Sequence, residues 1–438
     1  MRNYTHLNLN NTLLNKIQEH CISKWLVRKK KDFFDYQLLA FNAINSGNDV
    51  LINAPTGSGK TLAALLAPII NFEDDIKSGE LSTIYISPLK SLIYDIKRNL
   101  ELSINEIGLD INIETRTGDT SNYQKSKQLK KAPNFLVTTP ESFALLMSYE
   151  NADKYFTNVK YIVMDELHNI IYTKRGDLLL LNIARLKNIV PQAVKIALSA
   201  TIHETDKALD YISNSKNKTC INPKISKKIN LKIIKTRKPI PWSGHMAFYA
   251  IEEIYNIIKS YKSTIIFVNT RAQSEYIFQN LWKINNEKLK ICVHHGSLDR
   301  KIRQEIEHKM FNSKINCVVA TSSLELGIDW GDVELVIQVG APKGLSRIIQ
   351  RIGRSNHNLN EASNAILVPT NKFEYLECLA AQEALKKTNI ETFKEKEGSL
   401  DVLAQHINGV ACSKKFKPND LLELLFSPQV MLFVKLSP

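Results

Sequence analysis

Short apolar runs recur along most of the chain, with stretches of helical character between them. In the first half these runs cover residues 50–52, 83–86, 135–137, 161–164 and 194–198. The pattern restarts in the second half with residues 264–268, 291–293, 317–320 and 335–337. Uninterrupted apolar runs are typical of buried parallel strands, and strands that alternate with helices build a doubly wound sheet. The pattern therefore predicts an α/β fold with two parallel-sheet domains in tandem.

The other segments depart from this alternation. Apolar residues at helical spacing predict a helical segment over residues 1–30. We expect the two α/β domains at residues 31–212 and 246–395. Residues 213–245 predict a basic linker, because no acid interrupts the cations from Lys216 to Lys238. This linker is either a solvated surface or a contact for a phosphate backbone. Residues 396–438 look helical but are too few to close a core, so they are a docked fragment or the truncated start of a further domain.

A phosphate-binding loop follows the first strand. The chain reads Ala54-Pro55-Thr56-Gly57-Ser58-Gly59-Lys60-Thr61 and continues into residues 62–66, which favour helix. Backbone N–H groups of such a turn, with the positive end of the helix dipole, bind phosphates. Lys60 would reach the β- and γ-phosphates, and the Thr61 hydroxyl would bind Mg²⁺. The strict motif has glycine where Ala54 stands. The strand before the loop and the helix after it nevertheless predict a site for ATP and Mg²⁺.

A glutamine just upstream of this loop could recognise the nucleotide base. Gln37 ends the stretch Phe33-Phe34-Asp35-Tyr36-Gln37. A glutamine amide offers one donor and one acceptor to the edge of adenine, and an aromatic neighbour could stack on the base. The alternative is a helix with a buried aromatic residue.

Two carboxylates follow the strand at 161–164, at the sheet edge where ligands bind in doubly wound folds. Asp165 would hold Mg²⁺, and Glu166 would orient or deprotonate the attacking water. His168 could couple this site to Ser199 or Thr201, which follow the next strand. The stretch Asp-Glu-Leu-His does not match the metalloprotease pattern H-E-x-x-H.

Further polar residues come from the second predicted domain. Arg351 and Arg354, in Gln350-Arg351-Ile352-Gly353-Arg354, share one helical face. A guanidinium that reaches the γ-phosphate acts as an arginine finger, whereas the alternative is a structural pair that binds carboxylates. Gly327 and Asp329, after the strand at 317–320, could face both nucleotide and strand backbone.

Charge and cysteine content narrow the class of protein. Lysine and arginine outnumber the acids by 58 to 44, a net charge of +14 that favours nucleic acid as a partner unless it reflects a lysine-rich composition. The six cysteines include no C-x-x-C pair, which argues against a zinc ribbon or a disulfide scaffold. No signal peptide and no apolar run of about 18 residues is present, so we expect a cytoplasmic protein without a membrane segment. The sequence indicates no oligomeric state.

The ordered motifs resemble those of superfamily 2 DExH-box helicases, with two RecA-like domains. More narrowly, the chain resembles the large helicase-related family and its bacterial ligase-associated branch. The residues that carry the finer match are 85–90, 115–120, 174–177, 241–245, 294–298, 327–332 and 340–344. The resemblance implies ATP-driven 3′→5′ movement on single-stranded DNA, with unwinding of duplexes or RNA–DNA hybrids in DNA repair. Possible partners include a ligase system.

The resemblance also implies roles for individual residues. The catalytic set would be Lys60, Asp165, Glu166, His168, Gln350, Arg351 and Arg354. The residues along the nucleic-acid strand would be Ser87, Lys90, Arg116, Thr138, Thr139, Asn269, Arg271, Thr321 and Lys343. Many members of the superfamily have a third arginine where His357 stands, which leaves open which arginine contacts the γ-phosphate. Residues 400–406 resemble the start of a winged helix, so 396–438 would be part of one.

Two other functions compete with a helicase. A truncated module could bind nucleic acid or a partner with little or no productive unwinding. A small-molecule kinase would also need a phosphate loop, but two α/β domains and the Gln350–Arg354 stretch suit it poorly.

Overall fold

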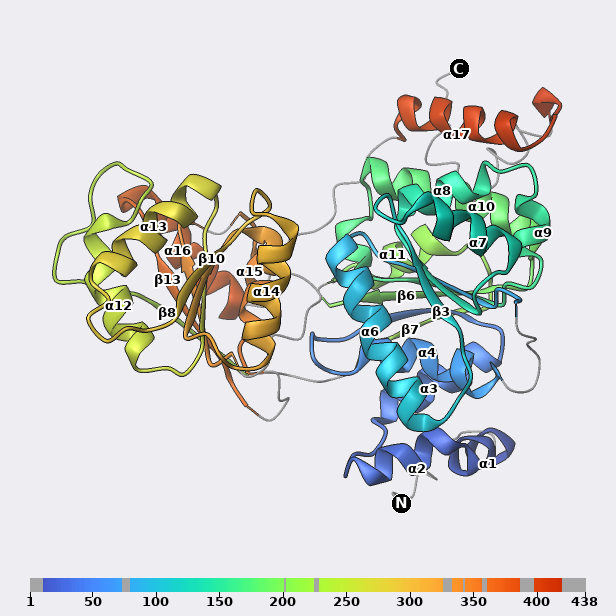
Figure 1. Cartoon of the computed structure of the whole chain (residues 1–438), viewed down its shortest axis with the longest axis horizontal. Coiled ribbons are helices and arrows are strands. Elements are labelled where there is room, and N and C mark those ends of the chain that lie inside the picture. The colour runs from blue at the N-terminus through green and yellow to red at the C-terminus, as the bar shows by residue number, and fades with distance from the viewer. Residues whose placement is uncertain are drawn as a thin grey trace. The chain divides into compact units, whose positions relative to one another are not determined.

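The computed structural model describes residues 11–72, 79–200, 202–223, 228–325, 333–341, 343–356, 361–386 and 398–419. These residues form two compact units, each with one sheet and its helices (Figure 1). The first unit includes Met1–Ala54, Gly59–Lys224 and Thr392–Pro438, and the second includes Ile225–Glu391. Several residues named above lie outside the described residues: Thr201, Gly327, Asp329 and His357.

The sheet of the first unit, sheet A, has seven parallel strands in the order β3-β4-β2-β5-β6-β1-β7. Its strands are β1 (Asp49–Asn53), β2 (Thr83–Ile86), β3 (Ile113–Arg116), β4 (Phe135–Thr138), β5 (Tyr161–Met164), β6 (Val194–Ser199) and β7 (Lys218–Ile221). The five inner strands are buried along their whole length, whereas the edge strands β3 and β7 are partly exposed. Burial on both faces explains why the inner strands appear as uninterrupted apolar runs in the sequence.

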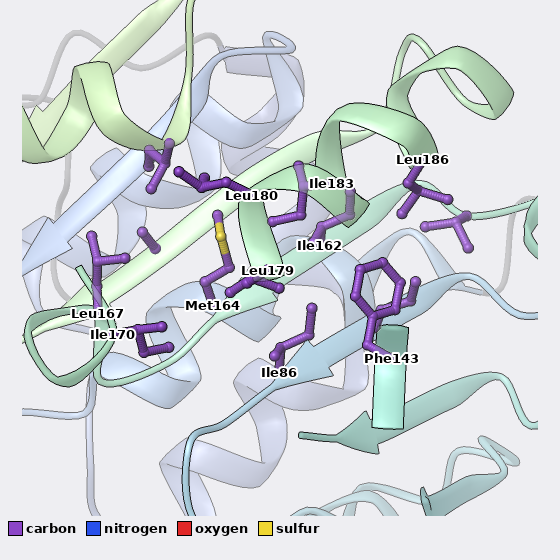
Figure 2. Packing of buried hydrophobic residues seen from close by; sticks show 14 of the residues in the cluster. Ile86, Phe143, Ile162, Met164, Leu167, Ile170, Leu179, Leu180, Ile183 and Leu186 are labelled. Atoms are coloured by element: carbon purple, nitrogen blue, oxygen red, sulfur yellow. The ribbon is translucent and has the colours of Figure 1, made fainter. Parts of the chain in front are cut away.

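Helices pack on both faces of sheet A. On one face lie α8 (Pro140–Met147), α10 (Lys174–Ile189) and α11 (Thr205–Ile212), and Figure 2 shows Phe143 and Leu179 from two of these helices beside Ile86 and Met164 of the sheet. The other face is covered by α3 (Asp35–Asn45), α4 (Lys60–Ile70) and α6 (Lys90–Ile107). The remaining helices of this unit are α1 (Asn11–Glu19), α2 (Cys21–Arg28), α7 (Asn122–Lys130), α9 (Ala152–Phe156) and α17 (Leu400–Ser413).

The sheet of the second unit, sheet B, has six parallel strands in the order β10-β11-β9-β12-β13-β8. Its strands are β8 (Ile229–Ile233), β9 (Thr264–Phe267), β10 (Ile291–His294), β11 (Cys317–Ala320), β12 (Leu335–Val339) and β13 (Ser363–Val368). One face packs on α12 (Ile251–Lys259) and α13 (Arg271–Lys283). The other packs on α14 (Arg300–Phe311), α15 (Leu345–Ile352) and α16 (Lys372–Lys386). Alternate residues of β9 supply the two cores, since Ile266 belongs to one and Ile265 to the other.

The predicted fold class, two tandem RecA-like parallel-sheet domains, is confirmed. The pattern missed four strands: β3, β7, β8 and β13. Two of these fall within residues 213–245, which we expected to be a linker, and they pair with β1 of sheet A and β13 of sheet B. β3, β7 and β8 lie at sheet edges and are only partly buried, so polar residues interrupt the apolar signal there.

Helix α17 packs against the first unit, on α8 and α10 (Figure 1). Its apolar side, with Val402 and Val410, contacts Leu178, Leu181 and Ala184 of α10. Polar contacts flank this core: Lys174 Nζ lies 2.7 Å from Asp401 Oδ2, and Ser399 N donates to Asp177 Oδ2 at 3.2 Å. The described part of residues 396–438 is therefore a docked helix.

A buried histidine makes this docking sensitive to pH. Burial, and next the positive charge of nearby Arg185, lower the pKa of His406 on α17 to about 4. An unfolded histidine titrates near 6.5, so between pH 6.5 and 4 the unfolded chain binds more protons than the folded chain. Stability is therefore full above pH 6.5 and falls as the pH falls.

We expect His406→Gln to remove this pH dependence. Between pH 7 and pH 5 the wild type should lose about 2 kcal/mol of stability through this residue. The variant should keep that stability. Thermal unfolding at both pH values measures the difference, with His203→Gln, an exposed histidine of the same unit, as the control. Identical pH dependence in wild type and His406→Gln would contradict the assignment.

Candidate nucleotide site and strand-facing residues

The phosphate loop lies between β1 and α4, as the sequence predicts. Gly57 and Gly59 have φ values of 77° and 86°, a left-handed backbone that glycine adopts without strain. A Cβ at Gly59 would also lie 2.7 Å from Gln37 Nε2. Lys60 begins α4, and its Nζ donates to Ala54 O at 2.7 Å, while Ser58 Oγ donates to Pro55 O at 2.7 Å. The Lys60 side chain therefore folds back over the phosphate loop, in the place where we expect it to bind phosphate.

Gln37 is buried against this loop. Its Oε1 accepts from Phe34 N at 3.0 Å, and its Nε2 donates to Gly59 O at 3.1 Å. The first contact caps α3 and the second connects the helix to the loop. A glutamine amide has a second N–H and a second lone pair, so this geometry is compatible with a base contact. The adenine contact stays a prediction.

Asp165 and Glu166 are buried directly after β5, next to a tyrosine from β2. The Tyr85 hydroxyl donates to Asp165 Oδ2 at 2.8 Å, and Glu166 N donates to Asp165 Oδ1 at 2.8 Å. Glu166 has φ 49° and ψ 46°, a left-handed conformation that is uncommon for a residue with a side chain. Strain of this kind is often found at functional sites.

The charge of Glu166 affects the protonation of Asp165. Burial, and next the charge of Glu166, raise the pKa of Asp165 to about 7, while Tyr85 and Lys60 oppose that rise. Burial, and next Asp165, raise the pKa of Tyr85 well above its usual value. The Tyr85 hydroxyl therefore stays protonated and can only donate to Asp165.

A divalent cation fits this arrangement. Its charge would offset the burial and the repulsion from Glu166 that raise the pKa of Asp165. It would find hard oxygen ligands in Asp165 and in Thr61, whose hydroxyl contacts Tyr85. Among the described residues no group of three or more His, Cys, Asp or Glu could hold a metal by itself. Mg²⁺ suits a site with few protein ligands, because it usually keeps several waters and binds substrate phosphates.

His168 connects this centre to β6. Burial lowers its pKa, so the imidazole is neutral. Asn169 Nδ2 lies 3.0 Å from its Nε2, and Ser199 Oγ lies 2.9 Å from its Nδ1. The same Nε2 also lies 3.4 Å from Glu166 Oε2, so the ring connects the Asp165-Glu166 pair to Ser199. The predicted contact with Ser199 is therefore present, whereas Thr201 lies outside the described residues.

Arg351 of the second unit is bound within that unit. It is buried, its Nε donates to Glu325 Oε1 at 2.7 Å, it also contacts Gln338 Oε1, and its guanidinium lies 5.0 Å from the centre of the Phe267 ring. This is the structural pairing that the sequence left open as an alternative to an arginine finger. Arg354 and Gln350 are also buried.

The strand-facing candidates of the first unit divide by exposure. Lys90 is exposed beside Asp119, with Nζ 2.7 Å from Oδ1. Arg116 is instead buried: its guanidinium donates to Lys125 O at 3.0 Å and to Tyr149 Oη at 3.1 Å. These contacts hold the Arg116 side chain within its own unit, and its predicted phosphate contact stays a prediction. The contacts arise because α7 packs over the end of β3, where a guanidinium satisfies buried oxygen atoms.

The other polar candidates of this unit are also buried. Thr138 Oγ1 donates to Arg116 O at 2.7 Å, and Thr139 Oγ1 caps α8 by accepting from Ser142 N at 3.2 Å. Ser87 is fully buried after β2. The two threonines hold the backbone at the sheet edge, whereas the buried Ser87 Oγ has no hydrogen-bond partner among the described residues.

In the second unit the candidates lie at the carboxyl edge of sheet B. Asn269 follows β9, and its Nδ2 donates to Ala341 O at 3.1 Å. Arg271 begins α13 and is exposed, as is Lys343, while Thr321 after β11 is partly buried. Because the strands are parallel, these residues all lie at the carboxyl edge of sheet B.

Two residues of the nucleotide site were missed in the sequence. Tyr85 lies in the apolar strand β2. A hydroxyl group within a run of buried residues needs a polar partner, and this was the signal in the sequence that could have identified it. Asn53 ends β1, and its side chain bonds both Ile202 O at 2.7 Å and Ile202 N at 3.3 Å. It fixes the segment after β6 beside the phosphate loop.

Two RecA-like units, a phosphate loop and a buried Asp-Glu pair are the features of a helicase core. The DEAD/DEAH box helicase family model matches residues 34–209, and the helicase conserved C-terminal domain matches residues 249–358. The chain is 34% identical to an ATP-dependent helicase Lhr-Core protein 2 of Thermococcus barophilus, over 97% of this chain and 51% of the relative. It is 37% identical to the ATP-dependent helicase Lhr-Core of Methanothermobacter thermautotrophicus, over 89% and 48%.

A solved structure agrees with these matches. The Mycobacterium smegmatis helicase Lhr, bound to ssDNA and AMP-PNP, superposes with a TM-score of 0.84 at 32% identity, over 95% of this chain and 56% of that one. The chain belongs to the Lhr family of superfamily 2 helicases, so the resemblance drawn from its motifs is confirmed. Its branch within the family stays a prediction. The chain spans about half the length of the two archaeal relatives. None of the described helices is long and apolar enough to cross a membrane.

Proposed function

We propose that this chain is the motor core of an ATP-dependent helicase that moves 3′→5′ along single-stranded DNA. The proposal rests on the buried Asp165-Glu166 pair near Lys60 of the phosphate loop. Glu166 has an unusual backbone conformation, and the pKa of Asp165 is raised. The structure of the M. smegmatis relative with ssDNA and AMP-PNP supports it.

Each residue of the nucleotide site has its own role in ATP hydrolysis. Lys60 and the loop N–H groups bind the phosphates, and Thr61 with Asp165 would hold Mg²⁺, which neutralises charge on the phosphates. Glu166 orients and deprotonates the attacking water. Neutral His168 would couple this centre to Ser199, whose Oγ lies 2.9 Å from its Nδ1. Arg351 is bound to Glu325 within its own unit, so a contact with the γ-phosphate would require its guanidinium to leave that carboxylate.

The strand would be held by its backbone, because a motor that moves along any sequence cannot depend on reading bases. The exposed cations Lys90, Arg271 and Lys343 would neutralise phosphates. Buried Arg116, Thr138 and Thr139 would keep the sheet edge in place.

We expect Lys343→Ala to weaken single-strand binding equally on unrelated sequences. Each phosphate neutralised on a single strand contributes about −0.7 to the slope of log affinity against log salt, so the variant should flatten the slope by about that amount. Fluorescence anisotropy over a salt series measures it. The control is Lys288→Ala, an exposed lysine at the opposite edge of sheet B, before β10. A loss confined to one sequence, or none at all, would remove Lys343 from the strand path.

A duplex-unwinding assay tests the proposed function. We expect displacement from duplexes with a 3′ single-stranded tail, and from RNA–DNA hybrids with that tail, but not from duplexes with a 5′ tail. Displacement only from 5′-tailed duplexes would contradict the direction. Because the chain spans half the length of its relatives, a second candidate is a core that binds nucleic acid and hydrolyses ATP with little unwinding. ATP hydrolysis without displacement from either duplex would select that candidate.

A role in DNA repair is part of the proposal and rests on the resemblance to the ligase-associated branch. The comparisons do not support a ligase as partner, so we propose none.

A further inference from the structure

One large aromatic side chain lies on the surface of the second unit, in a loop that the helicase chemistry does not use. Trp242 is 70% exposed, in the stretch Pro241-Trp242-Ser243-Gly244-His245 between β8 and α12. Exposing an indole to water is unfavourable, and tryptophans on protein surfaces are enriched where partners bind.

Hydrogen bonds hold this loop in place. Gly244 O accepts from Thr370 Oγ1 and from Asn371 Nδ2, both at 3.0 Å, and Lys372 N donates to Pro241 O at 2.9 Å. His245 O accepts from Gln273 Nε2 at 2.7 Å. The loop is therefore anchored at both ends, and its tryptophan is exposed on a fixed backbone.

The anchors place the loop at the carboxyl edge of sheet B. Thr370 and Asn371 directly follow β13. Gln273 connects the loop to a strand-facing candidate, because its Oε1 accepts from Asn269 N at 2.9 Å while its Nε2 binds the loop. Asn269 in turn donates to Ala341 O, two residues before Lys343. Trp242 thus belongs to the edge where we place the nucleic-acid backbone.

The ring itself is oriented by a lysine. Lys372 Nζ lies 3.7 Å from the centre of the Trp242 ring, a cation–π contact that restricts the rotation of the indole. Lys372 is exposed too, so the pair combines a flat aromatic surface with a positive charge. Proteins that bind single strands without sequence preference combine these same two elements.

We propose that Trp242 is a stacking platform for a base of the bound single strand, with Lys372 orienting the ring and adding charge near a phosphate. This inference rests on the proposed function, and it assigns a base contact where that function needs only backbone contacts. Stacking tolerates any sequence, because every base has a π-face. The platform is thus compatible with a motor that moves along any strand.

The test is binding of a labelled single-stranded oligonucleotide to the full chain, by anisotropy, with tryptophan emission as a second readout. We expect Trp242→Ala to bind about ten- to a hundredfold more weakly on unrelated sequences, and Trp242→Phe to retain most of the affinity. Wild-type emission should fall on binding, and Trp242→Phe should lose much of that quenching. The control is Trp282→Phe, which removes a 58% exposed tryptophan of the same unit.

The outcomes distinguish a failure of the stacking platform from a failure of the proposed function. A wild-type chain that binds no single strand would overturn the proposed function. A wild-type chain that binds, with Trp242→Ala of equal affinity and Trp242→Phe of equal quenching, would overturn the stacking platform alone. Thermal unfolding of the variants confirms that any loss of binding occurs in a folded chain.

Discussion

Exchanging Glu166 for glutamine should stop ATP turnover while leaving ATP binding in place. Glutamine keeps the size of the side chain and its place after Asp165, but it cannot accept a proton from the attacking water. Removing a general base typically costs about 10²–10⁴-fold in rate. Steady-state hydrolysis with single-stranded DNA measures turnover, and a fluorescent ATP analogue measures binding.

Two variants define the comparison. Lys60→Ala should lose affinity for the nucleotide, because its ammonium group binds phosphate, whereas Glu150→Gln, an exposed carboxylate of the same unit, should behave like wild type. Equal turnover in wild type and Glu166→Gln would remove Glu166 from the mechanism.

Glu325→Ala should destabilise the second unit by about 3–5 kcal/mol, because it leaves the guanidinium of Arg351 buried without its carboxylate. Urea unfolding measures the loss, with tryptophan emission compared between a Trp25→Phe background and the variant made in it, because Trp25 belongs to the first unit. Arg347→Ala is the matched control: Arg347 Nε lies 3.4 Å from the other oxygen of Glu325 and its side chain is 45% exposed, so its loss should cost about 0–1 kcal/mol.

A double variant checks the cause. Glu325→Leu with Arg351→Met removes both charges, so it should recover much of the stability that Glu325→Ala loses. If Glu325→Ala costs no more than Arg347→Ala, the buried pair does not stabilise the unit. In that case Arg351 would return as a candidate for the γ-phosphate beside Arg354.

The sequence predicted those parts of the fold that depend on local pattern. The inner strands of sheet A are predicted by their apolar runs, and the phosphate loop and Asp165-Glu166 directly follow two of these strands. The strand β8 could not be predicted in this way, because its short alternation of apolar and polar residues looks like part of a basic linker in isolation. Its pairing with β13, more than a hundred residues further along the chain, decides its structure.

The same limit applies to side chains. A cation after a strand suggests a phosphate contact, but the partners of Arg116 come from α7 and from Tyr149, and no local spacing reveals them. Arg351 likewise has a carboxylate partner, Glu325, on another segment. Tyr85 joins the nucleotide site only because β2 and β5 are neighbours in sheet A. Residues that are positioned by long-range packing therefore need the structure.

The most direct test of a nucleic-acid-driven motor is the rate of ATP hydrolysis by the wild-type chain, without and with saturating single-stranded DNA, above the Glu166→Gln baseline. The proposed function predicts slow hydrolysis alone and a clear rise when the strand is added. A rate that stays at the Glu166→Gln baseline in both conditions, or one that the strand leaves unchanged, would contradict it.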